Sequence, residues 1–192
     1  MMMRICIFCG SAMGNDDLYA EAVDNFVKEI ATIGGSLVYG GGNVGLMGVL
    51  ADSASQYGIE ISGVIPEHLK SAGLSHPKLT ELHIVQSMHD RKQLMSELSD
   101  AFVALPGGAG TLEEIVEQWT WAQIGLHQKA CGFLNVSSYF DKLCEFIEHM
   151  TRAGFVSREH TDMLVFEERP NELLLKLALS NPVNPKWSKE II

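Results

Sequence analysis

The sequence predicts an α/β fold in which helices cover both faces of a mostly parallel sheet of about six to seven strands. Short apolar runs alternate with segments of helical periodicity along the 192 residues, a length that suits one domain. Charged residues make up 20%, as expected where much of the chain is a sheet buried on both faces. Glycine-rich segments follow several apolar runs, at the strand ends where such sheets bind ligands. We therefore expect a single-domain, Rossmann-like, three-layer α/β/α architecture.

The predicted strands are short apolar runs that end at glycine, proline or polar residues. They cover residues 4–9, 36–39, 59–65, 81–85, 101–105, 130–136 and 163–166. The predicted helices have apolar residues three and four apart and cover residues 18–33, 44–57, 88–98, 111–124, 139–152 and 171–179. Residues 67–80 are expected to be irregular, and a loop of this length usually has a functional reason. We assign residues 1–180 to the domain and expect residues 181–192, which contain two prolines, to form a flexible tail.

The charge and cysteine content exclude several classes of protein. The net charge of −10 disfavours nucleic acid as a partner, because an acidic surface repels a polyanion. No apolar run approaches the length of about 20 residues that a membrane span needs, and no secretory segment precedes the first strand. The four cysteines include one C-x-x-C, Cys6 to Cys9, whose two side chains should point to opposite faces of the first strand. We expect buried reduced thiols, no metal and a cytoplasmic location.

The first glycine-rich motif covers residues 40–48, between a predicted strand and a predicted helix. Gly40, Gly42 and Gly45 match G-x-G-x-x-G, and such a loop lets an anion approach the backbone at a helix N-terminus. The loop follows the second strand, and the acidic residue about 20 positions on, Glu60, begins a strand instead of ending one, so NAD is disfavoured. A ligand-binding role is favoured over a plain tight turn.

The second glycine-rich motif covers residues 106–114, after the fifth strand. Thr111 is a natural N-cap, and no Gly-Lys-Ser/Thr follows, so the motif is not a triphosphate P-loop. Thr111 and Glu114 also have the spacing of a capping box, and this spacing alone favours a capping role for Glu114. A third motif places Arg91 and Lys92 near the N-terminus of a helix, where cations are unfavourable. They are either a solvated pair or the sign of an anionic ligand.

Together these motifs resemble the LONELY GUY (LOG) family of cytokinin riboside 5′-monophosphate phosphoribohydrolases. The resemblance rests on P-G-G-x-G-T-x-x-E at Pro106–Glu114, the Arg91-Lys92 pair and G-G-G-x-x-G-L-M-G at residues 40–48, with further similarity at residues 8–11 and 119–123. It covers nearly the whole chain, up to about residue 180. It implies a homodimer or larger assembly without a cofactor, in which Arg91 and Glu114 are catalytic. The implied substrate-binding positions are His68, Arg91, Lys92, Gly108, Ala109, Gly110, Thr111, Leu112, Glu113, Glu114 and Thr120.

The implied reaction is hydrolysis of the N-glycosidic bond of a purine nucleoside 5′-monophosphate, a cytokinin riboside monophosphate or AMP, to the free base and ribose 5-phosphate. The phosphate is expected at the glycine-rich helix N-termini, near Thr111 and the loop positions Ser11, Gly41, Gly42 and Gly45. His68 stands where the family often has glutamate, and Ala109 where tyrosine is frequent, so the base preference stays open. Lysine decarboxylation is disfavoured, because no lysine lies in a recognisable pyridoxal phosphate motif. A nucleotide or cofactor carrier without catalysis remains the alternative.

Overall fold

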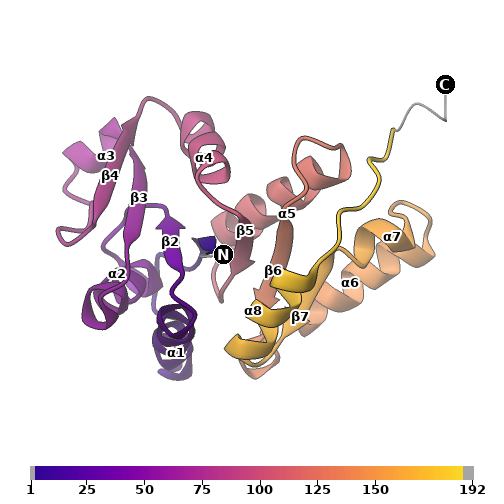
Figure 1. Ribbon diagram of the computed structural model, residues 1–192, viewed down its shortest axis with the longest axis horizontal. Coiled ribbons are helices and arrows are strands. Elements are labelled where there is room, and N and C mark those ends of the chain that lie inside the picture. Colours follow the sequence, from indigo (N-terminus) through magenta and orange to yellow (C-terminus); the bar gives the residue numbers. More distant parts are fainter. Residues whose placement is uncertain (1–2, 188–192) are drawn as a thin grey trace.

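The computed structural model describes residues 3–187, and these fold around one seven-stranded, all-parallel sheet (Figure 1). Its strands are β1 (Arg4–Phe8), β2 (Ser36–Tyr39), β3 (Ile61–Pro66), β4 (Glu81–Val85), β5 (Ala101–Ala104), β6 (Ala130–Leu134) and β7 (Leu164–Glu167). The helices are α1 (Leu18–Thr32), α2 (Gly45–Tyr57), α3 (Glu67–Ser71), α4 (Met88–Glu97), α5 (Ala109–Gln123), the 3-10 helix η1 (Val136–Ser138), α6 (Asp141–Arg152), α7 (Arg158–Thr161) and α8 (Pro170–Leu179). The predicted fold class is confirmed.

The strand order is β4-β3-β2-β1-β5-β6-β7, so the direction of winding reverses between β1 and β5. The chain first builds outward from β1 to β4 and then returns to place β5 against the other edge of β1. Ile5 of β1 is thereby in register with Leu37 of β2 on one side and Ala101 of β5 on the other. The chain that leaves β1 leads to α1 on one face, and the chain that leaves β5 leads to α5 on the other. Parallel sheets generally bind ligands at the carboxyl ends of strands at such a switch point.

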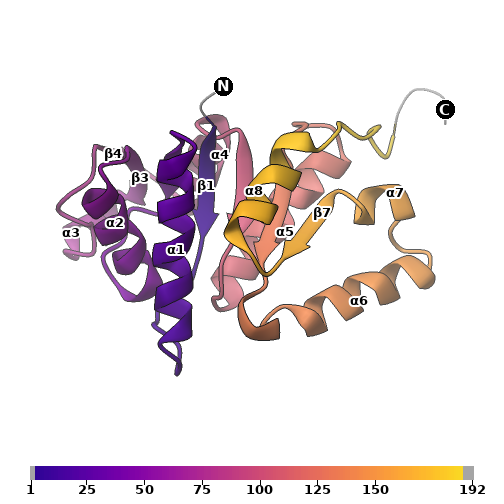
Figure 2. The ribbon, with the colours of Figure 1, turned by 60° about the horizontal axis from the view of Figure 1, so that its bottom comes forward.

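Two hydrophobic cores lie on the two faces of the sheet. One contains the buried side chains of α1, α2 and α8, and Figure 2 shows α1 and α8 on the same side of the sheet. The other contains buried side chains of α4, α5 and α6. Cys9 belongs to the first core and Cys6 to the second, as the alternation of side chains along a strand predicts.

The segment that was expected to be irregular, residues 67–80, contains the short helix α3 and then runs back beside the glycine loop. Gly42 and Ser75 form an isolated antiparallel bridge. The helices α3 and α7 were missed because a helix of four or five residues is too short to show a periodic pattern. The strand and helix boundaries otherwise differ from the predictions by about two residues, as fraying ends do.

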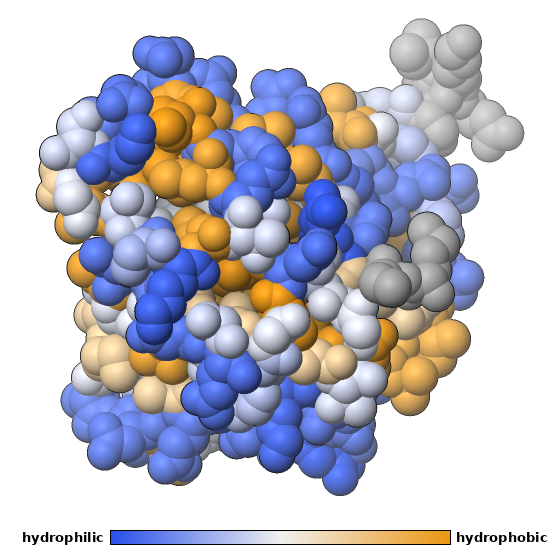
Figure 3. Space-filling model, turned by 60° about the vertical axis from the view of Figure 1, so that its left-hand side comes forward, coloured by the Kyte–Doolittle hydropathy of each residue, from blue (hydrophilic) through white to orange (hydrophobic). Residues whose placement is uncertain are grey.

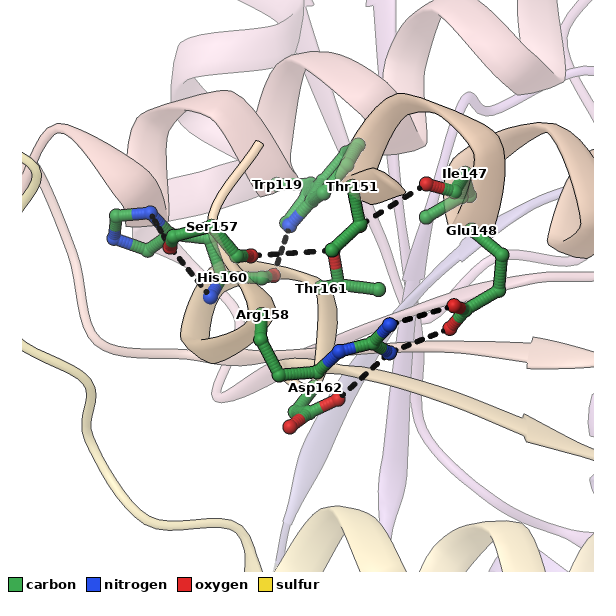
Figure 4. Close-up of polar contacts among 9 residues, drawn as sticks. All are labelled: Trp119, Ile147, Glu148, Thr151, Ser157, Arg158, His160, Thr161 and Asp162. Carbon is green, nitrogen blue, oxygen red and sulfur yellow. Dashed lines mark hydrogen bonds and ion pairs between the residues drawn. The ribbon is translucent and has the colours of Figure 1, made fainter. Parts of the chain in front are cut away.

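The helix α7 connects α6 to the C-terminal half of α5 (Figure 4). The Trp119 indole of α5 donates a hydrogen bond to the backbone oxygen of His160 at 2.8 Å. The hydroxyl oxygens of Thr151 and Thr161 lie 2.6 Å apart, and so join α6 to α7.

Part of the expected tail packs on the domain. The backbone N–H of Lys186 donates to the Gln123 oxygen at 2.7 Å, and the His160 ring lies 3.2 Å from the Asn184 oxygen. The rest of the predicted tail, residues 188–192, lies outside the described residues, and the domain limit at residue 180 stays a prediction.

None of the helices described between residues 3 and 187 is long and apolar enough to cross a membrane. The side of the molecule with α2, α3 and β4 shows apolar side chains among hydrophilic ones (Figure 3). At the open edge of the sheet, Ile84 of β4 is 43% exposed, and Met88 of α4 is 41% exposed.

Candidate active site

A buried ion pair between α4 and α5 is the central feature at the carboxyl end of the sheet. Nη1 of Arg91 lies 2.9 Å from Oε1 of Glu114, and each side chain is only 11% exposed. Arg91 lies in the first turns of α4, which follows β4, and Glu114 lies in the second turn of α5, which follows β5. The sheet therefore brings together two side chains that are 23 residues apart in the sequence.

The guanidinium of Arg91 is held from three sides. Its Nε donates to the backbone oxygen of Val64 at 3.2 Å, and its Nη1 lies 3.9 Å from the sulfur of Met88. On the third side it lies directly on the backbone of Gly40, where an added Cβ would overlap Nη2. Glycine at position 40 is thus required by close packing. The interpretation of Arg91 and Lys92 as a solvated pair is wrong, since both residues are buried.

The N-terminus of α4 is stabilised without these cations. Ser87 is its N-cap and forms a reciprocal capping box with Asp90, in which the N–H of Asp90 donates to the Ser87 hydroxyl at 3.1 Å. The acidic Asp90 meets the positive end of the helix dipole, and Arg91 and Lys92 turn inward towards α5.

Glu114 does not cap its helix, so the capping interpretation is wrong. The helix α5 begins at Ala109, its N-cap is Gly108, and it has no side-chain cap. Thr111 is therefore the third residue of the helix instead of its N-cap, and its hydroxyl lies against Gly107. Because the helix begins at Ala109, two residues before Thr111, Glu114 falls in its second turn and faces Arg91.

Burial raises the pKa of Glu114 above its ordinary value, and the nearby Arg91 guanidinium offsets part of that effect. Glu113 raises the pKa further, and Lys92 lowers it. A carboxylate with a raised pKa is a stronger base than an exposed one. Here the same cation that favours the charged form also fixes the orientation of the carboxylate.

The ammonium of Lys92 pairs with two other carboxylates of α5. It donates to Oε1 of Glu113 and, at 2.9 Å, to Oε1 of Glu117, and its side chain is 7% exposed. Burial alone would lower the pKa of Lys92, but its hydrogen bonds with both glutamates outweigh burial and raise it. Glu117 was not among the predicted site residues. Its spacing of four residues from Glu113, which places both on one face of a helix, was the available signal.

The start of α5 is open to solvent beside this ion pair. Gly108, Ala109 and Gly110 are exposed, and no atom lies within 4 Å of the Cβ position of either glycine. Leu112 is half-buried against the core, and its N–H donates to the Gly108 oxygen at 3.2 Å. The first N–H groups of a helix have no acceptor within the helix, so an anion can reach them at this exposed end.

The glycine loop after β2 closes the other side of the site. Gly41 and Gly45 have φ values of +73° and +56°, in the left-handed region that favours glycine. A Cβ on Gly45 would overlap the backbone of Ser11, so this glycine brings the loop after β1 against the start of α2. Of the predicted loop positions, Ser11 and Gly45 are thereby in contact, and Gly41 and Gly42 lie in the same loop as Gly45, against β3 and Met47.

Two predicted positions, His68 and Thr120, lie exposed and away from the hydrogen bonds of the central pair in the described part of the chain. His68 lies exposed on α3, and Thr120 lies exposed on α5, where its hydroxyl donates to the Val116 oxygen of its own helix at 2.8 Å. Among residues 3–187, no hydrogen bond or ion pair joins either side chain to Arg91 or Glu114. Their roles stay predictions.

The cysteines are free, and Cys6, Cys9 and Cys131 are buried while Cys144 is half-buried. Burial raises the pKa of the thiols of Cys6 and Cys9, with a further contribution from Glu114. In the described part of the chain, no three His, Cys, Asp or Glu side chains form a group that could hold a metal ion.

Comparison with solved structures identifies the same fold in distant proteins. The molybdenum cofactor binding protein of Rippkaea orientalis has a TM-score of 0.68 and 18% identity, covering 93% of this chain and 96% of that one. The molybdenum cofactor carrier protein of Chlamydomonas reinhardtii has a TM-score of 0.67 and 16% identity, covering 94% and 100%. At such identities the likeness shows the fold alone.

Sequence comparison finds much closer relatives. The family model described as possible lysine decarboxylase matches residues 47–177. A cytokinin riboside 5′-monophosphate phosphoribohydrolase of Arabidopsis thaliana is 41% identical over 188 residues, which cover 98% of this chain and 87% of that protein. One of Oryza sativa subsp. japonica is 41% identical over 174 residues, which cover 91% and 72%. The chain therefore belongs to the LOG family of cytokinin riboside 5′-monophosphate phosphoribohydrolases, as its motifs predicted.

Proposed function

We propose that the chain hydrolyses the N-glycosidic bond of a purine nucleoside 5′-monophosphate, a cytokinin riboside monophosphate or AMP, and releases the free base and ribose 5-phosphate. The observation that carries this proposal is the buried pair of Arg91 and Glu114 between two glycine-rich loops at the switch point of the sheet. The relatives named for this reaction, at 41% identity, support it. A carrier needs the glycine loops but has no use for a buried carboxylate beside the ribose.

Glu114 supplies the chemistry in this proposal. When the bond between C1′ and the base nitrogen breaks, the base leaves with the electron pair, and positive charge develops on the ribose. The carboxylate of Glu114 stabilises that charge and accepts a proton from the water whose oxygen bonds to C1′. The departing base nitrogen takes up one proton, and Glu114 releases the proton that it accepted, so the net reaction adds the OH of one water to C1′ and its H to the base. The raised pKa of Glu114 suits a group that must accept a proton.

Arg91 orients Glu114 and the substrate in the same scheme. Its charge favours the ionised form of the carboxylate. Its Nε donates to Val64 and its Nη1 pairs with Glu114, whereas Nη2 packs beside Gly40 and has no hydrogen-bond partner among residues 3–187. We assign Nη2 to a substrate oxygen. An arginine held at two of its nitrogens presents the third in a fixed direction.

The 5′-phosphate binds, in this proposal, at the exposed start of α5 and beside Ser11 and the glycine loop. A helix N-terminus with open N–H groups accommodates one phosphate even on a chain with a net charge of −10. Binding of this remote group positions C1′ for attack, so a nucleoside without it should react poorly. We keep His68, Lys92, Gly108–Glu114 and Thr120 as substrate-binding positions. For Lys92, the pairs with Glu113 and Glu117 indicate that any role in binding is shared with holding α4 against α5.

We further propose a homodimer in the cytoplasm that does not bind nucleic acid. The exposed apolar side chains of Ile84 and Met88 at the open edge of the sheet support a protein interface there. The free thiols favour a reducing compartment, and the negative net charge disfavours nucleic acid. Light scattering coupled to size-exclusion chromatography should give twice the chain mass of 21.1 kDa. A monomer mass at micromolar concentration would contradict the dimer.

The activity is tested by incubating the protein with AMP and, separately, with adenosine. We expect chromatography to detect free adenine and an equal amount of ribose 5-phosphate from AMP, and little adenine from adenosine. Binding of AMP without release of adenine would instead identify a carrier. A screen across nucleoside monophosphates, including a prenylated adenosine monophosphate, then determines the preferred base.

A further inference from the structure

The glycine loop is held from outside by a short segment that leads into β4. We call this segment, Leu74–His76, the strap. The backbone N–H of Asn43 donates to the Leu74 oxygen at 2.9 Å, and that of His76 donates to the Gly41 oxygen at 2.9 Å. These two bonds flank the bridge between Gly42 and Ser75, so the strap and the loop form a small antiparallel ribbon. Inside the fold, the Tyr39 hydroxyl donates to the Gly42 oxygen at 3.1 Å.

The His76 side chain connects the strap to α2, the helix that begins at the glycine loop. The residue is 8% exposed, and its Nδ1 accepts the backbone N–H of Lys78 at 3.2 Å. With Nδ1 as acceptor, the neutral ring carries its proton on Nε2, which lies 3.4 Å from Oδ1 of Asp52. Asp52 lies two turns into α2. The backbone of the strap therefore holds the glycine loop, and the imidazole of His76 holds the helix α2 that follows the loop.

The loop in turn is the surface on which Arg91 lies. The Arg91 guanidinium packs on Gly40 so closely that a Cβ there would overlap Nη2. The next residue, Gly41, packs against β3: a Cβ added to Gly63 of β3 would lie only 2.8 Å from the Cα of Gly41. The loop is thus confined by β3 on one side and the strap on the other. If the strap is released, the loop can move away from β3, and the support of Arg91 moves with it.

We propose that His76 is a positioning residue for the reaction: through the strap and Asp52 it holds the glycine loop against Arg91 and so keeps the pair of Arg91 and Glu114 aligned. The inference rests on the proposed function, and it concerns a residue that touches neither the substrate nor the reacting atoms. It gives the long connection between β3 and β4 a task in catalysis.

A purely structural histidine and a positioning histidine differ in what their removal changes. Loss of a structural side chain lowers the melting temperature and leaves the kinetics of the folded enzyme intact. Loss of a positioning side chain moves Arg91 away from Glu114. Because Arg91 lowers the pKa of Glu114 and burial raises it, the pKa of Glu114 should then rise further. Lys92, Glu113 and the buried thiols of Cys6 and Cys9 also affect or are affected by Glu114, and among residues 3–187 none of their side chains has a hydrogen bond or ion pair with the strap. The acid limb of the pH profile should therefore move to higher pH only for a positioning role.

The experiment compares His76→Ala with His76→Gln, Asp52→Ala and His160→Ala by adenine release from AMP. For His76→Ala we expect kcat/KM to fall on the order of 10- to 100-fold, largely through kcat, since misplacement of catalytic groups by about 1 Å has such effects. The acid limb should also move to higher pH. His76→Gln should recover part of the loss, because its amide can accept from Lys78 and donate to Asp52. Asp52→Ala, whose side chain is 67% exposed in the wild type, should fold and show a smaller loss in the same direction.

The matched control is His160 of α7, another buried histidine, whose ring lies within hydrogen-bond distance of the Ser157 hydroxyl and the Asn184 oxygen. His160→Ala should lower the melting temperature and leave kcat and the pH profile unchanged. Wild-type kinetics in His76→Ala would overturn the inference. If His76→Ala does not fold, wild-type kinetics in both Asp52→Ala and His76→Gln would overturn it instead. In either case, adenine release by the wild type would still uphold the proposed function. A wild type that releases no adenine would overturn both.

Discussion

Replacement of Glu114 by glutamine tests the proposed chemistry most directly. Glutamine has nearly the same shape and keeps an oxygen that can accept from Nη1 of Arg91, now 2.9 Å from the carboxylate. It removes the negative charge that would face the developing charge on the ribose. Loss of one such electrostatic group costs roughly 3–4 kcal/mol of transition-state stabilisation, about 100- to 1,000-fold in kcat. The KM for AMP should change little, since the phosphate contacts stay in place.

The stability of the same variant separates catalysis from helix capping. Removal of one partner from a buried ion pair costs up to about 3–5 kcal/mol. Here the remaining amide oxygen and the relief of carboxylate burial offset part of that cost, so we expect about 1–2 kcal/mol, or a melting temperature lower by roughly 2–8 °C. A cap would lose a similar amount, about 1 kcal/mol, but would keep its activity. The turnover number, not the melting temperature, distinguishes the two roles.

The assay is chromatographic detection of adenine from saturating AMP, with thermal unfolding followed in parallel. Glu60→Gln serves as the control, since Glu60 is exposed just before β3, at the opposite end of the sheet. It should match the wild type in both measurements. Turnover of Glu114→Gln within about threefold of the wild type, far above the expected loss of two to three orders of magnitude, would refute the assignment of Glu114.

Three further predictions follow from the geometry. Gly40→Ala should fold yet lose most of its activity, because the new Cβ displaces the Arg91 guanidinium; steady-state kinetics with circular dichroism checks this, and full activity would contradict the close packing. Because the pKa of Glu114 is raised, kcat/KM should begin to fall on acidification at a pH above the ordinary glutamate pKa of about 4.3. The same group should add stability to the fold as the pH falls, because the folded state binds its proton more tightly than the unfolded state. A pH profile of kcat/KM and thermal unfolding across the same pH range test the two signs, and an acid limb at the ordinary glutamate value would contradict the first. Trp119→Phe should lower the stability by about 1–3 kcal/mol, since the His160 carbonyl loses its buried donor (Figure 4), and denaturant unfolding with an unchanged midpoint would refute this.

The strand and helix pattern was largely readable from the sequence, because hydrophobic periodicity is a local property. The predicted strands at residues 36–39 and 81–85 agree with β2 and β4 at both ends. The family motifs also placed Arg91, Glu114 and both glycine loops among the site residues before any geometry was known. Where local spacing was used alone, it favoured the wrong role for Glu114, since a capping box and an inward-facing carboxylate look alike until the first residue of the helix is known.

The sequence by itself determined the fold class, the separation of Cys6 and Cys9 onto two faces, and the family. Only the tertiary structure decided which charges meet: Arg91 with Glu114, and Lys92 with Glu113 and Glu117. It also decided that the strap lies on the glycine loop, more than 30 residues earlier in the chain. The periodic spacing of apolar residues depends only on residues that are close together in the sequence. The pairing of buried charges depends on the strand order and on where each helix begins, which arise only when the whole sheet assembles.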